Sequence, residues 1–162
     1  MRAGQSGFTY IGLLFAIVIL GITLSTVGVV WSTQIRRDRE AELLYVGDQF
    51  RSAIGRYRAA GGTYPLALAD LVKDERTPAV RRFLRRVYAD PMTNSTDWEL
   101  IMAPEGGILG VASKSQDKPI KVAGFSPINA AFEKMECYCD WKFIYSPRYN
   151  RYRRNAKPAQ PP

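Results

Sequence analysis

The residues best suited to covalent or metal chemistry are two cysteines, Cys137 and Cys139, with Tyr138 between them. A structural zinc site needs about four cysteine or histidine ligands, and the chain has no histidine and no other cysteine to complete one. The pair could form a strained internal disulfide or exchange with a partner thiol. It could also stay as free thiols packed as small apolar groups, or form bridges between chains. The sequence leaves these alternatives open.

The C-terminal tail, residues 148–162, is a second candidate for binding chemistry. Its arginines are interleaved with Tyr149 and Tyr152, and single-stranded nucleic acid binders use this combination because bases stack on aromatic rings while guanidinium groups contact phosphates. The four arginines are Arg148, Arg151, Arg153 and Arg154. We expect the tail to be disordered. We favour a solvated end, or one lying on anionic lipid or an acidic partner subunit, over contact with nucleic acid.

Most of the excess positive charge lies near the C-terminus, and the amino-acid composition argues against catalysis. The chain has 162 residues and a formal net charge of +8, and six basic residues but no acidic one follow Asp140. The part before the tail is therefore nearly balanced in charge. No histidine is present to act as a general base, and we find no activated nucleophile, phosphate-binding loop or paired catalytic carboxylates. We expect one small domain that is not an enzyme and needs no cofactor.

The clearest sign of secondary structure in the sequence is an apolar run near the N-terminus. From Phe8 to Trp31 there are 24 residues without a charge, more than the ~20 that a helix needs to cross a bilayer core. A cleaved signal peptide is one alternative, but its apolar core is usually ~7–15 residues and ends in a small-x-small cut site. A plain single-span anchor that never assembles is another. We interpret residues 8–35 as a retained membrane helix.

The residues before this run form a short hydrophilic leader, 1–7, with one basic side chain. A cut between Gly7 and Phe8 would leave the apolar helix on the mature protein, unlike the cut of an ordinary signal peptide. This arrangement resembles the type III signal of type IV pilins and of the pseudopilins of type II secretion. The resemblance rests on Gly7, Phe8, Thr9, Ile11, Leu13 and Leu14. It implies that a prepilin peptidase cuts after Gly7 and methylates Phe8.

The resemblance also implies assembly of the helix into a filament, through Phe8, Ile11, Gly12, Leu13 and Leu14. Gly12 departs from the family pattern, because pilins usually carry a glutamate there whose carboxylate pairs with the terminal amine of a neighbouring subunit. Burying the charge of the amine without a partner costs free energy. Either the amine is satisfied in another way, or this subunit occupies a special place in the filament, such as its tip.

The sequence pattern of the remaining chain predicts an α+β fold. An amphipathic stripe continues the helix to about Ala60, and Gly61-Gly62 ends it. Short helices are expected over 66–72 and 80–87, the second with a basic face that is either solvated surface or a contact site: Arg81, Arg82, Arg85 and Arg86. Strands are expected at 98–102, 108–112, 120–123 and 141–145, the first two joined as a hairpin. The sheet would cover the stripe, as in the pilin fold, within a globular domain spanning 36–147.

Taken together, the resemblance implies a structural pseudopilin of type II secretion. It would be a single-pass protein of the bacterial inner membrane with its C-terminal domain in the periplasm. Its partners would be other pilin-like subunits, the prepilin peptidase, the inner-membrane assembly platform and membrane lipid. A minor pilin or competence pseudopilin that contacts DNA is the alternative. The family's calcium loop corresponds to 113–118, where Asp117 is the one carboxylate, so calcium binding is only weakly indicated.

Overall fold

The computed structural model describes residues 6–76 and 80–146, with side chains described for 10–21, 31–76 and 80–146. The chain divides into two compact units, Met1–Asp38 and Arg39–Pro162. We refer to the first as the helical unit and to the second as the head unit. The described elements are one long helix and a small antiparallel sheet, so the predicted α+β class is confirmed.

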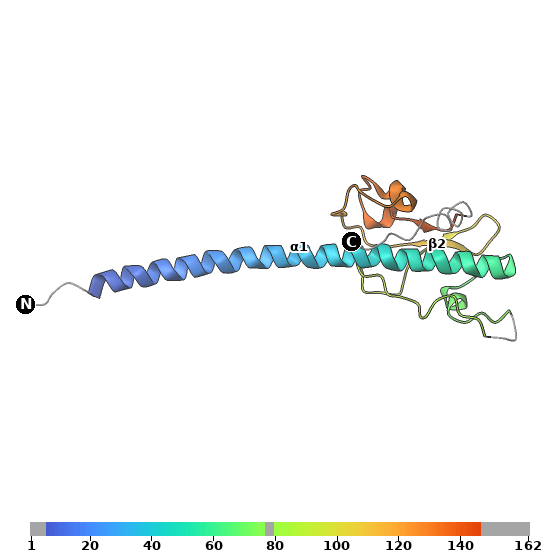
Figure 1. Ribbon diagram of the computed structural model, residues 1–162, viewed down its shortest axis with the longest axis horizontal. Helices are drawn as coiled ribbons and strands as arrows, with labels where there is room; N and C mark the ends of the chain where they lie inside the picture. The colour runs from blue at the N-terminus through green and yellow to red at the C-terminus, as the bar shows by residue number, and fades with distance from the viewer. Residues whose placement is uncertain (1–5, 77–79, 147–162) are drawn as a thin grey trace, which may run out of the picture. The chain divides into compact units, whose positions relative to one another are not determined.

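Helix α1 runs from Ser6 to Gly61 and contains 56 residues (Figure 1). No proline stands before Pro65, so no hydrogen bond is missing from the helix interior on that account. Gly62 takes a φ of 75°, and its N–H donates to the carbonyl of Arg58 at 2.7 Å. The predicted helix and its glycine-induced end are confirmed.

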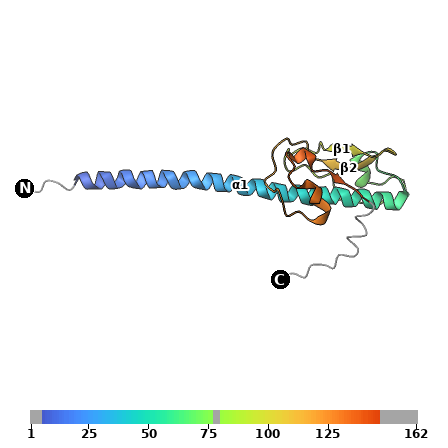
Figure 2. The ribbon, with the colours of Figure 1, turned by 90° about the horizontal axis from the view of Figure 1, so that it is seen from above.

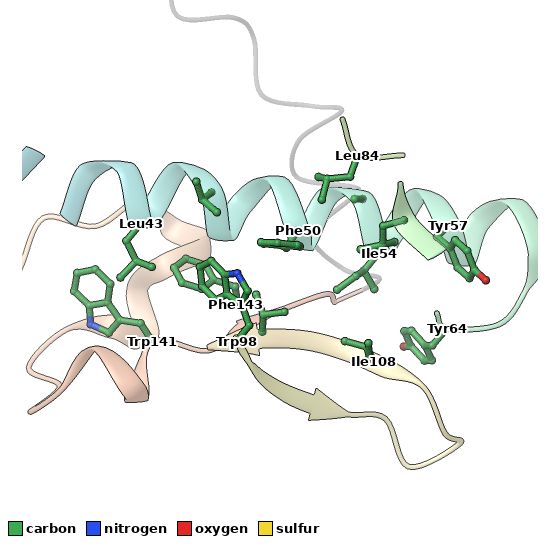
Figure 3. Close-up of a cluster of buried hydrophobic side chains, with 14 of the residues drawn as sticks. Leu43, Phe50, Ile54, Tyr57, Tyr64, Leu84, Trp98, Ile108, Trp141 and Phe143 are labelled. Atoms are coloured by element: carbon green, nitrogen blue, oxygen red, sulfur yellow. The ribbon is translucent and has the colours of Figure 1, made fainter. Parts of the chain in front are cut away.

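The apolar stripe of α1 forms one wall of the head-unit core. Its most buried members are Leu43, Val46, Phe50, Ile54 and Tyr57. They pack against side chains from the sheet and from the connections between elements, as Figure 3 shows for Trp98, Ile108 and Phe143. The predicted stripe is confirmed from Leu43 onward, whereas Ile35, which the same periodicity includes, is 40% exposed.

The sheet has three antiparallel strands in the order β1-β2-β3: β1 (Glu99–Met102), β2 (Ile108–Ala112) and β3 (Phe143–Ile144). Figure 2 shows β1 and β2 side by side. The register places Leu100 opposite Val111 and Val111 opposite Phe143. The predicted hairpin is confirmed, and the last strand is shorter than predicted. The strand predicted at 120–123 is wrong, because the N–H of Lys121 donates to the Glu40 carboxylate at 2.9 Å instead of to a neighbouring strand.

The two short helices predicted after α1 are largely wrong. Only a 3₁₀ turn, η1 (Leu68–Leu71), forms in the first region. In the second, the N–H groups of Phe83 and Leu84 both donate to the carbonyl of Leu71, at 2.9 and 2.8 Å. These bonds tie 80–87 to another segment and leave no helical ladder. Two further 3₁₀ turns that the sequence did not indicate are η2 (Pro127–Phe132) and η3 (Tyr138–Asp140).

Candidate assembly helix and head-unit sites

The helical unit presents apolar side chains all round α1. The exposed fractions of Ile11, Leu13 and Leu14 are 55%, 57% and 45%. Those of Phe15 and Ile19 are 65% and 59%. Because successive residues turn by ~100° around a helix, these five positions are spread around its axis and leave no sector wider than ~120° without a large apolar side chain. A helix that is apolar all round is normally buried in a large protein, in a membrane or among other helices.

Gly12 leaves open space on this surface, since a Cβ built there has no neighbour within 4 Å. The Gly7–Phe8 bond lies in the first turn of α1, where a helix frays most easily. Within the residues that the structure describes, we find no helix long and apolar enough to cross a membrane.

The structure joins Cys137 and Cys139 in a disulfide, one of the alternatives that the sequence left open. The N–H of Tyr138 donates to the Asp117 carbonyl, and that of Cys139 to the Ser115 carbonyl, both at 3.1 Å. The bridge therefore lies where η3 is held against the 113–118 loop. The two sulfur atoms and an Asp140 oxygen lie within 4.8 Å of one another, but sulfur atoms in a disulfide are not thiolate ligands.

The 113–118 loop has little to offer calcium. The side chain of Asp117 is exposed, and it belongs to no cluster of three candidate metal ligands among the described residues. The carbonyls of Ser115 and Asp117 already accept hydrogen bonds from the η3 segment. Calcium prefers six to eight oxygen ligands, commonly from several carboxylates, so the loop fits the ion poorly.

The tail arginines Arg148, Arg151, Arg153 and Arg154 lie outside the described residues. The basic residues at 81–86 are described, and all four side chains are exposed, although no helix presents them.

Besides Asp74, three charged side chains that the sequence analysis did not single out are buried among the described residues of the head unit and position its loops. Asp90 is fully buried, and its carboxylate accepts from Met92 N–H at 2.9 Å and from the Ser113 hydroxyl at 2.6 Å. Arg51 is 2% exposed and donates to Asp48 and Asn129. The third is Glu40, 4% exposed. The only sequence signal for these anchors was polar residues at helix-stripe or turn positions.

Arg76 closes the C-terminal end of α1. Its guanidinium donates to both oxygens of Asp74 and to the Tyr57 carbonyl, one of the last of the helix, at 3.2 Å. It also lies over the Tyr57 ring, 3.5 Å from the centroid. The Arg76 guanidinium lowers the pKa of Asp74 through hydrogen bonds and charge, while burial raises the pKa of Tyr57. This cluster stabilises the connection after α1.

Comparison with known proteins found no match to any family model, curated protein or solved structure.

Proposed function

We propose that this chain is a structural pilin-like subunit, a pseudopilin of a type II secretion system, which assembles through its N-terminal helix into a periplasmic filament. The observation that carries the proposal is the apolar circumference of α1 in the helical unit, which follows a leader that could be cut between Gly7 and Phe8.

The physical support is the cost of exposed apolar surface. Burial is worth about 25 cal/mol per Å² of apolar area, so a helix with half-exposed leucines, isoleucines and phenylalanine on every side favours an apolar surround. Before assembly, the charge-free run of 24 residues would lie in the inner membrane as a single span. After processing, the same surface would pack against neighbouring helices of the filament.

The head unit supports the second half of the proposal. Its core is built on the same helix, α1, through Leu43, Phe50 and Tyr57, so the helix that would enter the filament also belongs to the head's hydrophobic core. Filament growth would thus displace the heads with their helices, and the work done on a secreted cargo would be mechanical.

The proposal is tested by expressing the full chain with and without a prepilin peptidase and measuring its intact mass and N-terminal residue. We expect the peptidase to remove residues 1–7 and to leave an N-methylated Phe8. Gly7→Val should block this change, whereas Gly4→Val, a matched change within the leader, should not. Retention of Met1 to Gly7 by the wild-type chain in both cases refutes the proposal.

Assembly needs a separate readout. In cells that carry the assembly platform, Ile11→Lys should leave cleavage intact and abolish filaments seen by electron microscopy, because a lysine ammonium would be buried without a partner. Filaments of Ile11→Lys as abundant as those of the wild type would show that the apolar surface does not drive assembly.

A further inference from the structure

A surface groove in the head unit combines arginines with tyrosines and contains no carboxylate. It has a volume of about 530 Å³. From α1 it is lined by Tyr45, Gln49 and Arg56, which are spaced by four and seven residues and therefore share one helix face. At ~1.5 Å per residue, this face extends over ~16 Å. The groove is thus elongated, unlike a pocket for one small ion.

The opposite wall comes from the segment 80–88, which is anchored by two consecutive residues, Phe83 and Leu84. Leu84 is 4% exposed, and the Phe83 ring packs edge-on against Tyr57 with centroids 5.6 Å apart. The carbonyl of Phe83 accepts from the Arg56 guanidinium at 2.5 Å, which joins the two walls. This anchoring directs Arg82 and Arg85 into the lining, and both are exposed.

The far end of the wall is fixed by Tyr88. Its carbonyl accepts from the Trp98 indole at 2.8 Å, and its ring lies edge-on to Phe50. The other aromatic lining residue, Tyr45, is 60% exposed, so its ring is available for stacking. The groove therefore offers a held tyrosine and an open one beside the arginines.

The lining arginines are not neutralised within the head unit. Neither Arg82 nor Arg85 forms an ion pair with any residue that the structure describes. By contrast, the depression near the end of α1 that Arg76 lines also contains Asp70, Glu75 and Glu105. Three guanidinium groups along one groove without an acid favour a ligand with several negative charges.

We propose that this groove binds a short stretch of single-stranded nucleic acid, with Arg56, Arg82 and Arg85 contacting phosphates and Tyr45 stacking on a base. Arginine binds phosphate through paired N–H donors, and stacking on an aromatic ring tolerates any base. An acidic peptide, such as one from a second copy of the chain, would satisfy the arginines but has no use for an exposed ring. The exposed Tyr45 ring therefore favours nucleic acid over an acidic peptide.

The test is fluorescence anisotropy of a short oligothymidylate with the full, unprocessed chain in mild detergent. Because processing and filament formation are not needed, failure here is distinct from failure of the proposed function. All variants carry glutamine at the five basic positions of the tail, so that its charge cannot account for binding: Arg148, Arg151, Arg153, Arg154 and Lys157. We expect binding with a logarithmic salt slope of about -2, from roughly -0.7 for each of three neutralised phosphates.

The control uses a second pair of arginines from the same segment, 80–88. Arg82→Gln with Arg85→Gln should weaken binding about tenfold or more and flatten the slope by about 1.4. Arg81→Gln with Arg86→Gln removes the same charge from neighbouring positions outside the lining. The Arg86 guanidinium lies 5.3 Å from the centroid of the lining Tyr88 ring, but it is not itself in the lining, so this pair should have a smaller effect. Equal weakening by the two pairs, or no binding by the tail-neutral chain, overturns the proposal.

The exposed ring separates nucleic acid from an acidic peptide. Tyr45→Leu should weaken oligothymidylate binding about fivefold or more, whereas Tyr45→Phe should retain it, because stacking requires an aromatic ring. A chain of sugar-phosphates without bases should bind more weakly than oligothymidylate. If oligoglutamate competes as well as oligothymidylate and Tyr45→Leu changes nothing, the groove is an acidic-peptide site and the nucleic acid proposal is wrong.

Discussion

The close approach of Phe143 to Gly47 predicts how a substitution at Gly47 changes the stability of the head unit. A glycine inside a helix is usually unfavourable, so replacing it with alanine should stabilise the helix by about 1 kcal/mol. Here a Cβ would overlap the Cγ, Cδ1 and Cε1 atoms of Phe143, far inside van der Waals contact. Gly47→Ala should therefore destabilise the head unit.

The magnitude follows from how firmly the Phe143 ring is held. The ring is fully buried, lies edge-on to Phe132 with centroids 5.1 Å apart, and has the Arg51 guanidinium 5.5 Å from its centroid. It would need to retreat by more than about 1 Å to reach the ~3.5–4.0 Å of an ordinary carbon contact. Overpacking of this kind typically costs about 1–3 kcal/mol. Because the ring is held on several sides, we take the upper part of this range, about 2–3 kcal/mol; less the gain of about 1 kcal/mol in helix propensity, the net loss should be about 1–2 kcal/mol.

The assay is denaturant unfolding of the full chain in mild detergent, followed by tryptophan fluorescence. Trp98 and Trp141 are buried in the head unit and report its unfolding, whereas Trp31 is 70% exposed. Gly21→Ala is the matched control, because that helix position has nothing within 4 Å of a new Cβ. It should not lower the free energy of unfolding.

A double-mutant cycle separates the clash from other effects. Phe143→Leu removes the overlapping ring atoms, so Gly47→Ala should cost at least about 1 kcal/mol less in that background than in the wild type. A Gly47→Ala chain as stable as the wild type would refute the close-approach explanation. So would two costs that simply add.

Three further predictions concern charge and covalent links. Because Arg76 lowers the pKa of Asp74 in the folded state, this carboxylate stabilises the fold above the ordinary value of about 4 and loses that contribution as pH falls through the lower folded value. Acid unfolding curves should therefore show a smaller loss of stability below pH ~4 for Asp74→Asn than for the wild type. Asp90→Ala should lower the free energy of unfolding by about 1–3 kcal/mol, because the donors that now bond to its carboxylate would be left unpaired. An unchanged denaturation midpoint would show that water replaces the carboxylate. Replacing both Cys137 and Cys139 by serine should cost no more than about 1.5 kcal/mol, since the bridge closes a very short loop, and a larger loss in the same denaturation assay would contradict that estimate.

Local signals were enough to predict part of the fold. The apolar stripe from Leu43 onward, the glycine pair that ends α1 and the hairpin of β1 and β2 each depend on residues close together in the chain. Their hydrogen bonds are made within the element or across one short turn, so neighbouring residues decide them.

The sequence misled where backbone groups bond to distant segments. The periodic run 80–87 resembles a helix, but Leu71 takes the hydrogen bonds of Phe83 and Leu84, and tertiary packing overrides propensity in such a short piece. The expected strand at 120–123 failed for the same reason, because Glu40, far away in the chain, accepts from Lys121.

The amino-acid sequence was enough to locate the charge-free run and the basic tail, because these are properties of consecutive residues. The close approach of the Phe143 ring to Gly47, and the groove that Arg56 and Arg82 line together, are visible only in the folded chain. Both require residues far apart in the chain to be brought together, and long-range contact depends on the packing of the whole head unit, which no local pattern encodes.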